Sequence, residues 1–218
     1  MFPFDILFDI TLYDILIGTG LLVCLLVFRK YADRLGLRAK LQNLVLFCSL
    51  AAVVVGYGCA VLMQSVYHWI DTGKFEITGA TFYGGLLGGA AVFLLIYFIG
   101  GRYAYRGTAV PDYTKRKFFR VADIAACSIT VAHGFGRLGC LMAGCCYGKE
   151  TSGAFSITFH TSAFAPNGVA LVPTQIYSSI LDFLHYGLLL LILRSQKKDG
   201  ETAAAYLIFY TAGRFVLE

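Results

Sequence analysis

Long apolar runs are the feature that most constrains this chain. Six stretches are rich in Leu, Ile, Val, Phe and Ala: residues 10–28, 41–67, 80–99, 118–136, 174–193 and 203–218. A helix of roughly 20 residues crosses the hydrocarbon core of a bilayer, and helices satisfy their own backbone groups there. The hydrophobic fraction of 58% exceeds the share of about half that is usual for soluble domains. The sequence therefore predicts an all-α integral membrane protein, a polytopic bundle of six to seven transmembrane helices.

The order of these runs predicts a single transmembrane domain over residues 1–218. Residues 149–173 are more polar and contain Asn167 and two prolines, which predicts an outer loop or a small extracytoplasmic cap. The opening MFPFDILFDI carries acids where a signal peptide would carry Lys or Arg, so we expect no cleavage. The final apolar run stops inside its own pattern, which predicts a truncated C-terminal helix, in either a short protein or a fragment.

Basic residues gather in alternate connections between the apolar runs. Of the 18 Lys and Arg residues, five lie in residues 29–40, six in 102–120 and three in 194–201. By the positive-inside rule these connections are cytoplasmic, which places the N-terminus, residues 71–76 and the predicted cap outside. Topology thus explains the net charge of +5, and we expect a membrane rather than nucleic acid as the partner.

Two arginines depart from this charge pattern. Arg137 and Arg214 fall within or at the outer ends of apolar runs, where a guanidinium is costly unless it faces a polar cavity or partner. Two such planar donors suit a phosphodiester. His133, four residues before Arg137, has the titration range of a general base. We therefore predict a lipid-phosphate site. The alternatives are interfacial anchors, ion pairs of Arg137 with Asp123 and of Arg214 with Glu218, and a packing histidine.

Glycines mark two of the apolar runs. The segment FYGGLLGGA (82–90) contains overlapping pairs of glycines four residues apart, which predicts close packing of this helix against a neighbour. The segment AHGFGRLG (132–139) leaves two structures open, a continuous helix or a helix that breaks beside a cavity.

Three cysteines follow Arg137 closely. Cys140, Cys145 and Cys146 have the spacing C-x4-C-C, which does not match the paired C-x2-C of structural zinc, and no histidine lies at a zinc-finger distance. The spacing therefore predicts no metal site, and we expect no cofactor. Three alternatives stay open: a disulfide facing an oxidising exterior, a redox-active pair, and close packing of small residues.

Several motifs, taken together, resemble the bacterial prolipoprotein diacylglyceryl transferases. They are FYGGLLGG, GRLGCLMAGCCYG with Asp123 before it, PTQIY and YTAGRFVLE. The resemblance implies a multi-pass enzyme of the bacterial inner membrane. It also implies transfer of the diacylglyceryl group of phosphatidylglycerol to the lipobox cysteine thiol of a preprolipoprotein, with release of glycerol phosphate. A phospholipid and a lipoprotein precursor are the partners that follow from it.

The same resemblance implies roles for individual residues. Arg137 and Arg214 are similar to the two arginines associated with phospholipid binding and catalysis. Five other residues are similar to family positions at the site: Glu218 as the companion glutamate, Tyr13 of the first helix, Asp123 before the motif, Gly148 at its end and Gln175 in the P-[ST]-Q-x-Y segment.

Some positions differ from the family pattern GR-x-GNF-x-N-x-E. Cys140, Ala143 and Cys145 stand at the positions of Asn, Asn and Glu, and Tyr83 replaces a histidine proposed as a base. The chain thus resembles a divergent branch, in which we expect Cys140 to contact substrate and His133 or Tyr83 to deprotonate the acceptor. Three other classes remain: a lipid transferase with a glycan or small thiol as acceptor, a membrane thiol oxidoreductase, and a non-enzymatic lipid-binding or transport protein.

Overall fold

The computed structural model describes residues 10–217, with side chains to residue 215. Its helical elements are α1 (Leu12–Arg34), α2 (Ala39–Thr72), α3 (Phe82–Leu95), the π-helix η1 (Ile96–Gly100), α4 (Gly101–Ala104), α5 (Tyr113–Ala143), α6 (Thr174–Ser195) and α7 (Glu201–Leu217). In the described part of the chain, five helices are long and apolar enough to cross a membrane, with α3 to α4 forming one of them. The predicted all-α membrane class is confirmed.

The chain forms two compact units, each described by itself. The site unit comprises Met1–Ala32 and Phe119–Glu218, and therefore contains α1, most of α5, α6 and α7. The hairpin unit comprises Asp33–Phe118 and contains α2, α3, η1 and α4. The expectation of a single transmembrane domain stays a prediction.

Glycines bring α2 and α3 together in the hairpin unit. A Cβ atom on Gly84 would lie 2.8 Å from the carbonyl oxygen of Cys59, and one on Gly56 would lie 3.0 Å from the carbonyl oxygen of Gly85. Such distances leave no room for a side chain, so the predicted close packing of the glycine-rich helix is confirmed.

Substitution of Gly88 tests this packing. A Cβ atom there would lie 2.6 Å from both the Cβ and the Sγ of Cys59. We expect Gly88→Ala to lower the free energy of unfolding by about 1–3 kcal/mol, because overpacking forces the helices apart. Gly58→Ala is the matched control, because a Cβ atom on Gly58 meets nothing within 4 Å. Thermal unfolding in detergent compares the two, and equal midpoints would contradict the prediction.

Helix α5 runs without a break through the glycines that left its continuation open. A Cβ atom on Gly134 would lie 2.8 Å from the ring of Phe183, and one on Gly139 would lie 3.2 Å from the ring of Tyr13. These glycines therefore admit aromatic rings from α6 and α1 rather than breaking the helix. His133 and Arg137 consequently lie one turn apart on one face.

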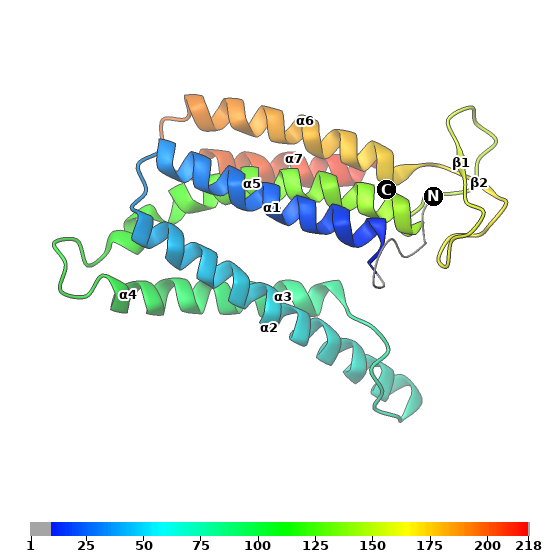
Figure 1. The fold of residues 1–218 in the computed structure, drawn as a ribbon, viewed down its shortest axis with the longest axis horizontal. Helices are drawn as coiled ribbons and strands as arrows, with labels where there is room; N and C mark the ends of the chain where they lie inside the picture. The colour runs from blue at the N-terminus through cyan, green and yellow to red at the C-terminus, as the bar shows by residue number, and fades with distance from the viewer. Residues whose placement is uncertain (1–9, 218) are drawn as a thin grey trace. The chain divides into compact units, whose positions relative to one another are not determined.

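A small cap connects α5 and α6. Its strands β1 (Ile157–Thr158) and β2 (Ala170–Leu171) are antiparallel, with Ile157 opposite Leu171. A local core of Phe159, Ala165 and Leu171 holds the cap together. Figure 1 shows the cap beyond the ends of α5 and α6 in the site unit. The small cap expected from the polar composition of residues 149–173 is therefore present as a folded element.

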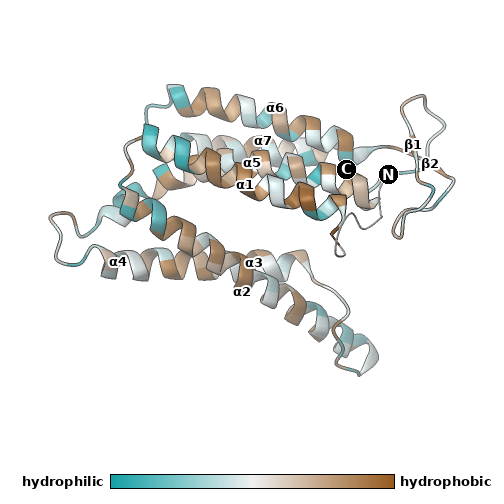
Figure 2. Ribbon diagram, viewed as in Figure 1, coloured by the Kyte–Doolittle hydropathy of each residue, from teal (hydrophilic) through white to brown (hydrophobic). Residues whose placement is uncertain are grey.

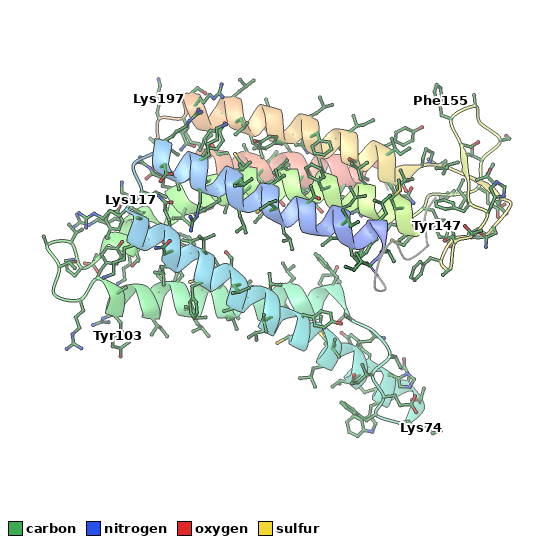
Figure 3. The ribbon with its side chains drawn as sticks, in the orientation of Figure 1. Lys74, Tyr103, Lys117, Tyr147, Phe155 and Lys197 are labelled. Atoms are coloured by element: carbon green, nitrogen blue, oxygen red, sulfur yellow. The ribbon has the colours of Figure 1, made fainter. Side chains whose placement is uncertain are left out.

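In each unit, the more hydrophilic residues gather toward the ends of the helices and hydrophobic residues predominate between them (Figure 2). In the site unit, Lys197 lies at one end and Tyr147 and Phe155 lie at the other (Figure 3). In the hairpin unit, Lys74 and Lys117 lie at opposite ends (Figure 3). This separation agrees with basic connections alternating between two faces of a membrane. Which face is the cytoplasmic one stays a prediction.

Candidate active site

The candidate site begins where α5 ends. Gly144 follows the last helical residue with φ 76°, a left-handed conformation that suits glycine, and its N–H donates to the carbonyl oxygen of Cys140 at 2.9 Å. The N–H of Cys145 donates to the same oxygen at 3.1 Å. Cys146 also has a positive φ of 56°, which is unusual for a residue with a side chain. The chain thus folds back toward the final turn of α5.

The start of α6 holds this returning loop in place. The side-chain amide of Gln175 donates to the carbonyl oxygen of Cys145 at 2.7 Å, and the hydroxyl of Thr174 donates to that of Cys146 at 2.8 Å. The N–H of Gly148 donates to the carbonyl oxygen of Val172 at 3.0 Å. Gly148 must be a glycine, because a Cβ atom would lie 2.7 Å from Thr174 and 2.9 Å from the Val172 oxygen. The loop between α5 and the cap is therefore fixed at several points.

A pocket of about 650 Å³ lies within the site unit, a volume typical of small-molecule sites. Its lining is Arg137, Cys146, Tyr147, Gly148, Lys149, Val172, Thr174, Ser178 and Arg214. The structure thus brings Arg137 of α5 and Arg214 of α7 to one cavity. Lys149, which sequence reasoning assigned only to an outer loop, adds a third cation to the same wall.

A buried carboxylate accompanies the two arginines. Asp182 of α6 is 6% exposed and interacts electrostatically with Arg137 and with Arg214. Such an acid counters the repulsion between two guanidinium groups in a site of low dielectric. Sequence reasoning did not include Asp182 among the site residues. The available signal was an ionisable side chain inside an apolar run, which marks a functional candidate by default.

His133 lies near Arg137 but is not among the residues that line the pocket. Its ring packs against that of Tyr210 of α7 at a tilt of 43°, with the ring centroids 5.6 Å apart. Its Nδ1 atom is buried, and no hydrogen-bond partner for it lies among the described residues. Its proximity to Arg137 matches the sequence prediction of one shared helix face, and its role as a base stays a prediction.

The three cysteines converge in space. The Sγ atoms of Cys140, Cys145 and Cys146 all lie within 4.8 Å of one another, and all three thiols are free. Tyr13 of α1 interacts electrostatically with each of them. Burial raises the pKa of the Cys145 thiol above its ordinary value, so without a partner that thiol stays protonated and is a poor nucleophile. This property weighs against a thiol oxidoreductase.

Comparison with known proteins identifies the family of this chain. The family model for prolipoprotein diacylglyceryl transferase matches residues 2–218. The chain belongs to this family. One relative, phosphatidylglycerol–prolipoprotein diacylglyceryl transferase 2 of Clostridium perfringens, is 33% identical over 94% of this chain and 77% of its own length. The phosphatidylglycerol–prolipoprotein diacylglyceryl transferase of Clostridium tetani is 30% identical over 94% of this chain and 78% of its own length.

In this diacylglyceryl transferase family member, the partners of Asp123 argue against its alternative ion pair with Arg137, whereas its predicted contact with substrate stays a prediction. Its carboxylate is fully buried and accepts hydrogen bonds from the N–H groups of Gly200 and Ala203, at 2.7 and 2.9 Å, and from the Gln196 amide at 3.1 Å. Fourteen residues of unbroken helix separate it from Arg137, a distance of about 21 Å. Asp123 therefore anchors the start of α7 and neither pairs with Arg137 nor lines the pocket.

Two further catalytic residues were predicted, Tyr83 and Glu218. Tyr83 is 69% exposed at the start of α3 and packs edge-on against Phe82, in the hairpin unit. Glu218 lies outside the described residues. Both catalytic roles stay predictions.

Gln175 is not among the residues that line the pocket, and its predicted contact with substrate stays a prediction. It is 1% exposed, and its amide is the donor that holds the carbonyl oxygen of Cys145. We expect Gln175→Met to destabilise the protein by about 1–3 kcal/mol, because a buried acceptor loses its partner. Transfer should also fall. Tyr177→Phe, an exposed position on the same helix, is the control. Unchanged thermal unfolding and activity in Gln175→Met would contradict this assignment.

Proposed function

We propose that this chain moves the diacylglyceryl group of phosphatidylglycerol to the thiol of a lipobox cysteine and releases glycerol phosphate. The observation that carries the proposal is that Arg137 and Arg214 line the same pocket, in a unit whose helices are long and apolar enough to cross a membrane. Guanidinium groups bind phosphate oxygens in bidentate fashion. The names of the relatives in Clostridium state the same donor and acceptor classes.

Different residues of the chain have different roles in the proposed reaction. Arg137 and Arg214 hold the phosphodiester and stabilise the charge that develops on the departing glycerol phosphate. The acceptor sulfur attacks the lipid glycerol carbon next to the phosphoester oxygen. A C–S bond forms, the C–O bond breaks, and its electron pair leaves on the phosphate oxygen. His133, or less favourably Tyr83, takes the thiol proton in this scheme. The negative charge of Asp182 partly offsets the charge of the two guanidinium groups.

The location of the pocket supports a reaction at the outer face of the inner membrane. Tyr147 lines the pocket, and Figure 3 shows it at the end of the site unit opposite Lys197. Lys197 belongs to one of the basic connections that the positive-inside rule assigns to the cytoplasm. The pocket then opens at the outer face, with the N-terminus on the same side.

Reconstitution with defined substrates tests the proposal. The purified protein is incubated with labelled phosphatidylglycerol and a lipobox peptide, and both products are measured by mass spectrometry. We expect a thioether-linked diacylglyceryl peptide and glycerol phosphate in equal amounts. A peptide with serine in place of the lipobox cysteine should give neither product. Release of glycerol phosphate without a thioether would overturn the assigned acceptor in favour of a glycan or a small thiol.

A further inference from the structure

The thiol cluster, formed by Cys140, Cys145 and Cys146, offers three thiols, which is the number of protein ligands in a catalytic zinc site. Its three Sγ atoms lie within 4.8 Å of one another. Structural zinc has four protein ligands, whereas catalytic zinc has three and leaves the fourth position open for water or substrate. The spacing C-x4-C-C does not match the usual zinc motif, but the turn at Gly144 brings the three sulfurs together by another route.

We propose that the thiol cluster binds a Zn²⁺ ion whose fourth position receives the acceptor thiol. This inference rests on the proposed function, because it assigns how the acceptor of that reaction is activated. It replaces the expectation of no metal, which depended on linear spacing alone.

The local backbone favours this assignment. Consecutive side chains of an extended chain point in opposite directions, so adjacent cysteines do not ordinarily share a ligand. Here the left-handed conformation of Cys146, with φ 56°, turns its side chain to the same side as that of Cys145. Such conformations persist only where surrounding contacts enforce them, and they concentrate at functional sites. The hydrogen bonds from Thr174 and Gln175 to this loop hold Cys146 in its left-handed conformation.

The distances require only a small adjustment. Zinc–sulfur bonds of about 2.3 Å in a tetrahedron place the sulfurs about 3.8 Å apart. The present separations, all within 4.8 Å, are close to that value. Rotation of the cysteine side chains is sufficient to shorten the sulfur–sulfur distances to this value. These side chains have room to rotate, because Cys146 is exposed and Cys140 and Cys145 are only partly buried.

The ion would lie beside the donor lipid. Cys146 lines the same pocket as Arg137 and Arg214, and Arg137 precedes Cys140 by three residues on α5. Three thiolates leave Zn²⁺ with one net negative charge, and a fourth thiolate adds another. The neighbouring guanidinium groups and Lys149 offset this charge. The acceptor sulfur and the phosphodiester would therefore meet in one cavity.

Zinc coordination supplies the deprotonation that the reaction needs. The three cysteines lose their protons when the ion binds, and a coordinated acceptor thiol is deprotonated in the same way, with its proton passing to solvent. The zinc-bound thiolate then attacks the glycerol carbon as the C–O bond to glycerol phosphate breaks. Zinc remains divalent throughout. Neither His133, which does not line the pocket, nor Tyr83 then has to act as the base.

Metal binding can be measured without any transfer assay. The protein is purified in detergent, its zinc content is determined, and the ion is exchanged for Co²⁺ as an optical probe. We expect one ion per chain and an absorption band from thiolate-to-cobalt charge transfer. The triple variant Cys140→Ser, Cys145→Ser, Cys146→Ser should lose both. Cys24→Ser, outside the thiol cluster, should retain both. Metal-free protein, or a disulfide between two of the three cysteines, would overturn the inference.

Transfer assays then separate this inference from the proposed function. Removal of the ion should lower transfer to the lipobox peptide by at least about 100-fold, the range of general-base effects, and added Zn²⁺ should restore it. Full transfer by metal-free protein would overturn the inference and leave the proposed function standing. Conversely, zinc-loaded protein that never modifies the peptide would refute thiol activation and the proposed acceptor together. Thermal unfolding of the triple variant, and of Cys146→Ser as a single change at an exposed position, tests whether lost transfer reflects unfolding.

Discussion

Replacement of Arg137 by alanine is expected to abolish diacylglyceryl transfer while folded protein is retained in detergent. The guanidinium lies in the pocket with Arg214 and would contact the phosphate in both ground and transition states. Loss of a single donor to a developing oxyanion costs about 100- to 1,000-fold in rate, and a bidentate arginine supplies two such donors. We therefore expect product from Arg137→Ala to fall below detection in the assay with labelled phosphatidylglycerol.

Two controls sharpen this experiment. Arg137→Lys keeps the charge but loses the planar fork, so its activity should lie between those of the wild type and Arg137→Ala. Arg120→Ala removes an arginine from the other end of α5, where it pairs with Asp199 at 2.8 Å outside the pocket. That partly exposed ion pair contributes little to stability, and transfer should remain near the wild-type value. Full activity of Arg137→Ala would refute the assigned phosphate site.

Replacement of Asp123 by alanine is expected to have the largest effect on stability. The change leaves two backbone N–H groups, of Gly200 and Ala203, and the Gln196 amide without their shared acceptor in a buried position. We expect a loss of about 3 kcal/mol or more, because each of the three donors left without an acceptor costs about 1–3 kcal/mol. Thermal unfolding and size-exclusion profiles in detergent measure the loss.

The asparagine variant distinguishes structural from substrate roles. Asp123→Asn retains an acceptor oxygen for some of the three donors, so its stability should lie between those of the wild type and Asp123→Ala. The transfer activity per folded molecule should change little in either variant, because Asp123 lies about 21 Å from Arg137 along α5. A raised KM for phosphatidylglycerol at unchanged stability would instead support the sequence expectation of substrate contact.

The presence of membrane helices and the close packing of one of them were predictable from local patterns. Three patterns were informative: apolar runs of transmembrane length, alternate basic connections, and the glycine pairs of residues 82–90. Each pattern depends on one segment of the chain alone. Their outcomes, an all-α membrane chain and a tight α2–α3 contact, follow from burial and from small side chains. The significance of Arg137 and Arg214 also came from the sequence, because a guanidinium inside an apolar run needs a polar partner.

Other features depended on where distant segments meet. The continuity of α5 required knowing that aromatic rings of Tyr13 and Phe183 fill the space at its glycines. The role of Asp123 required knowing that the start of α7 lies against its carboxylate. Asp182, an acid in an apolar run, was not distinguishable as a partner of the arginines until α5, α6 and α7 were placed together.

The sequence alone therefore determined the class of protein, its family resemblance and the two arginines, because hydropathy, charge and motif order are properties of the linear chain. Only the tertiary structure decided the pocket that joins those arginines and the convergence of Cys140, Cys145 and Cys146. The physical reason is the turn at Gly144 and the hydrogen bonds from the start of α6. They bring together three sulfurs whose spacing along the chain predicts no site.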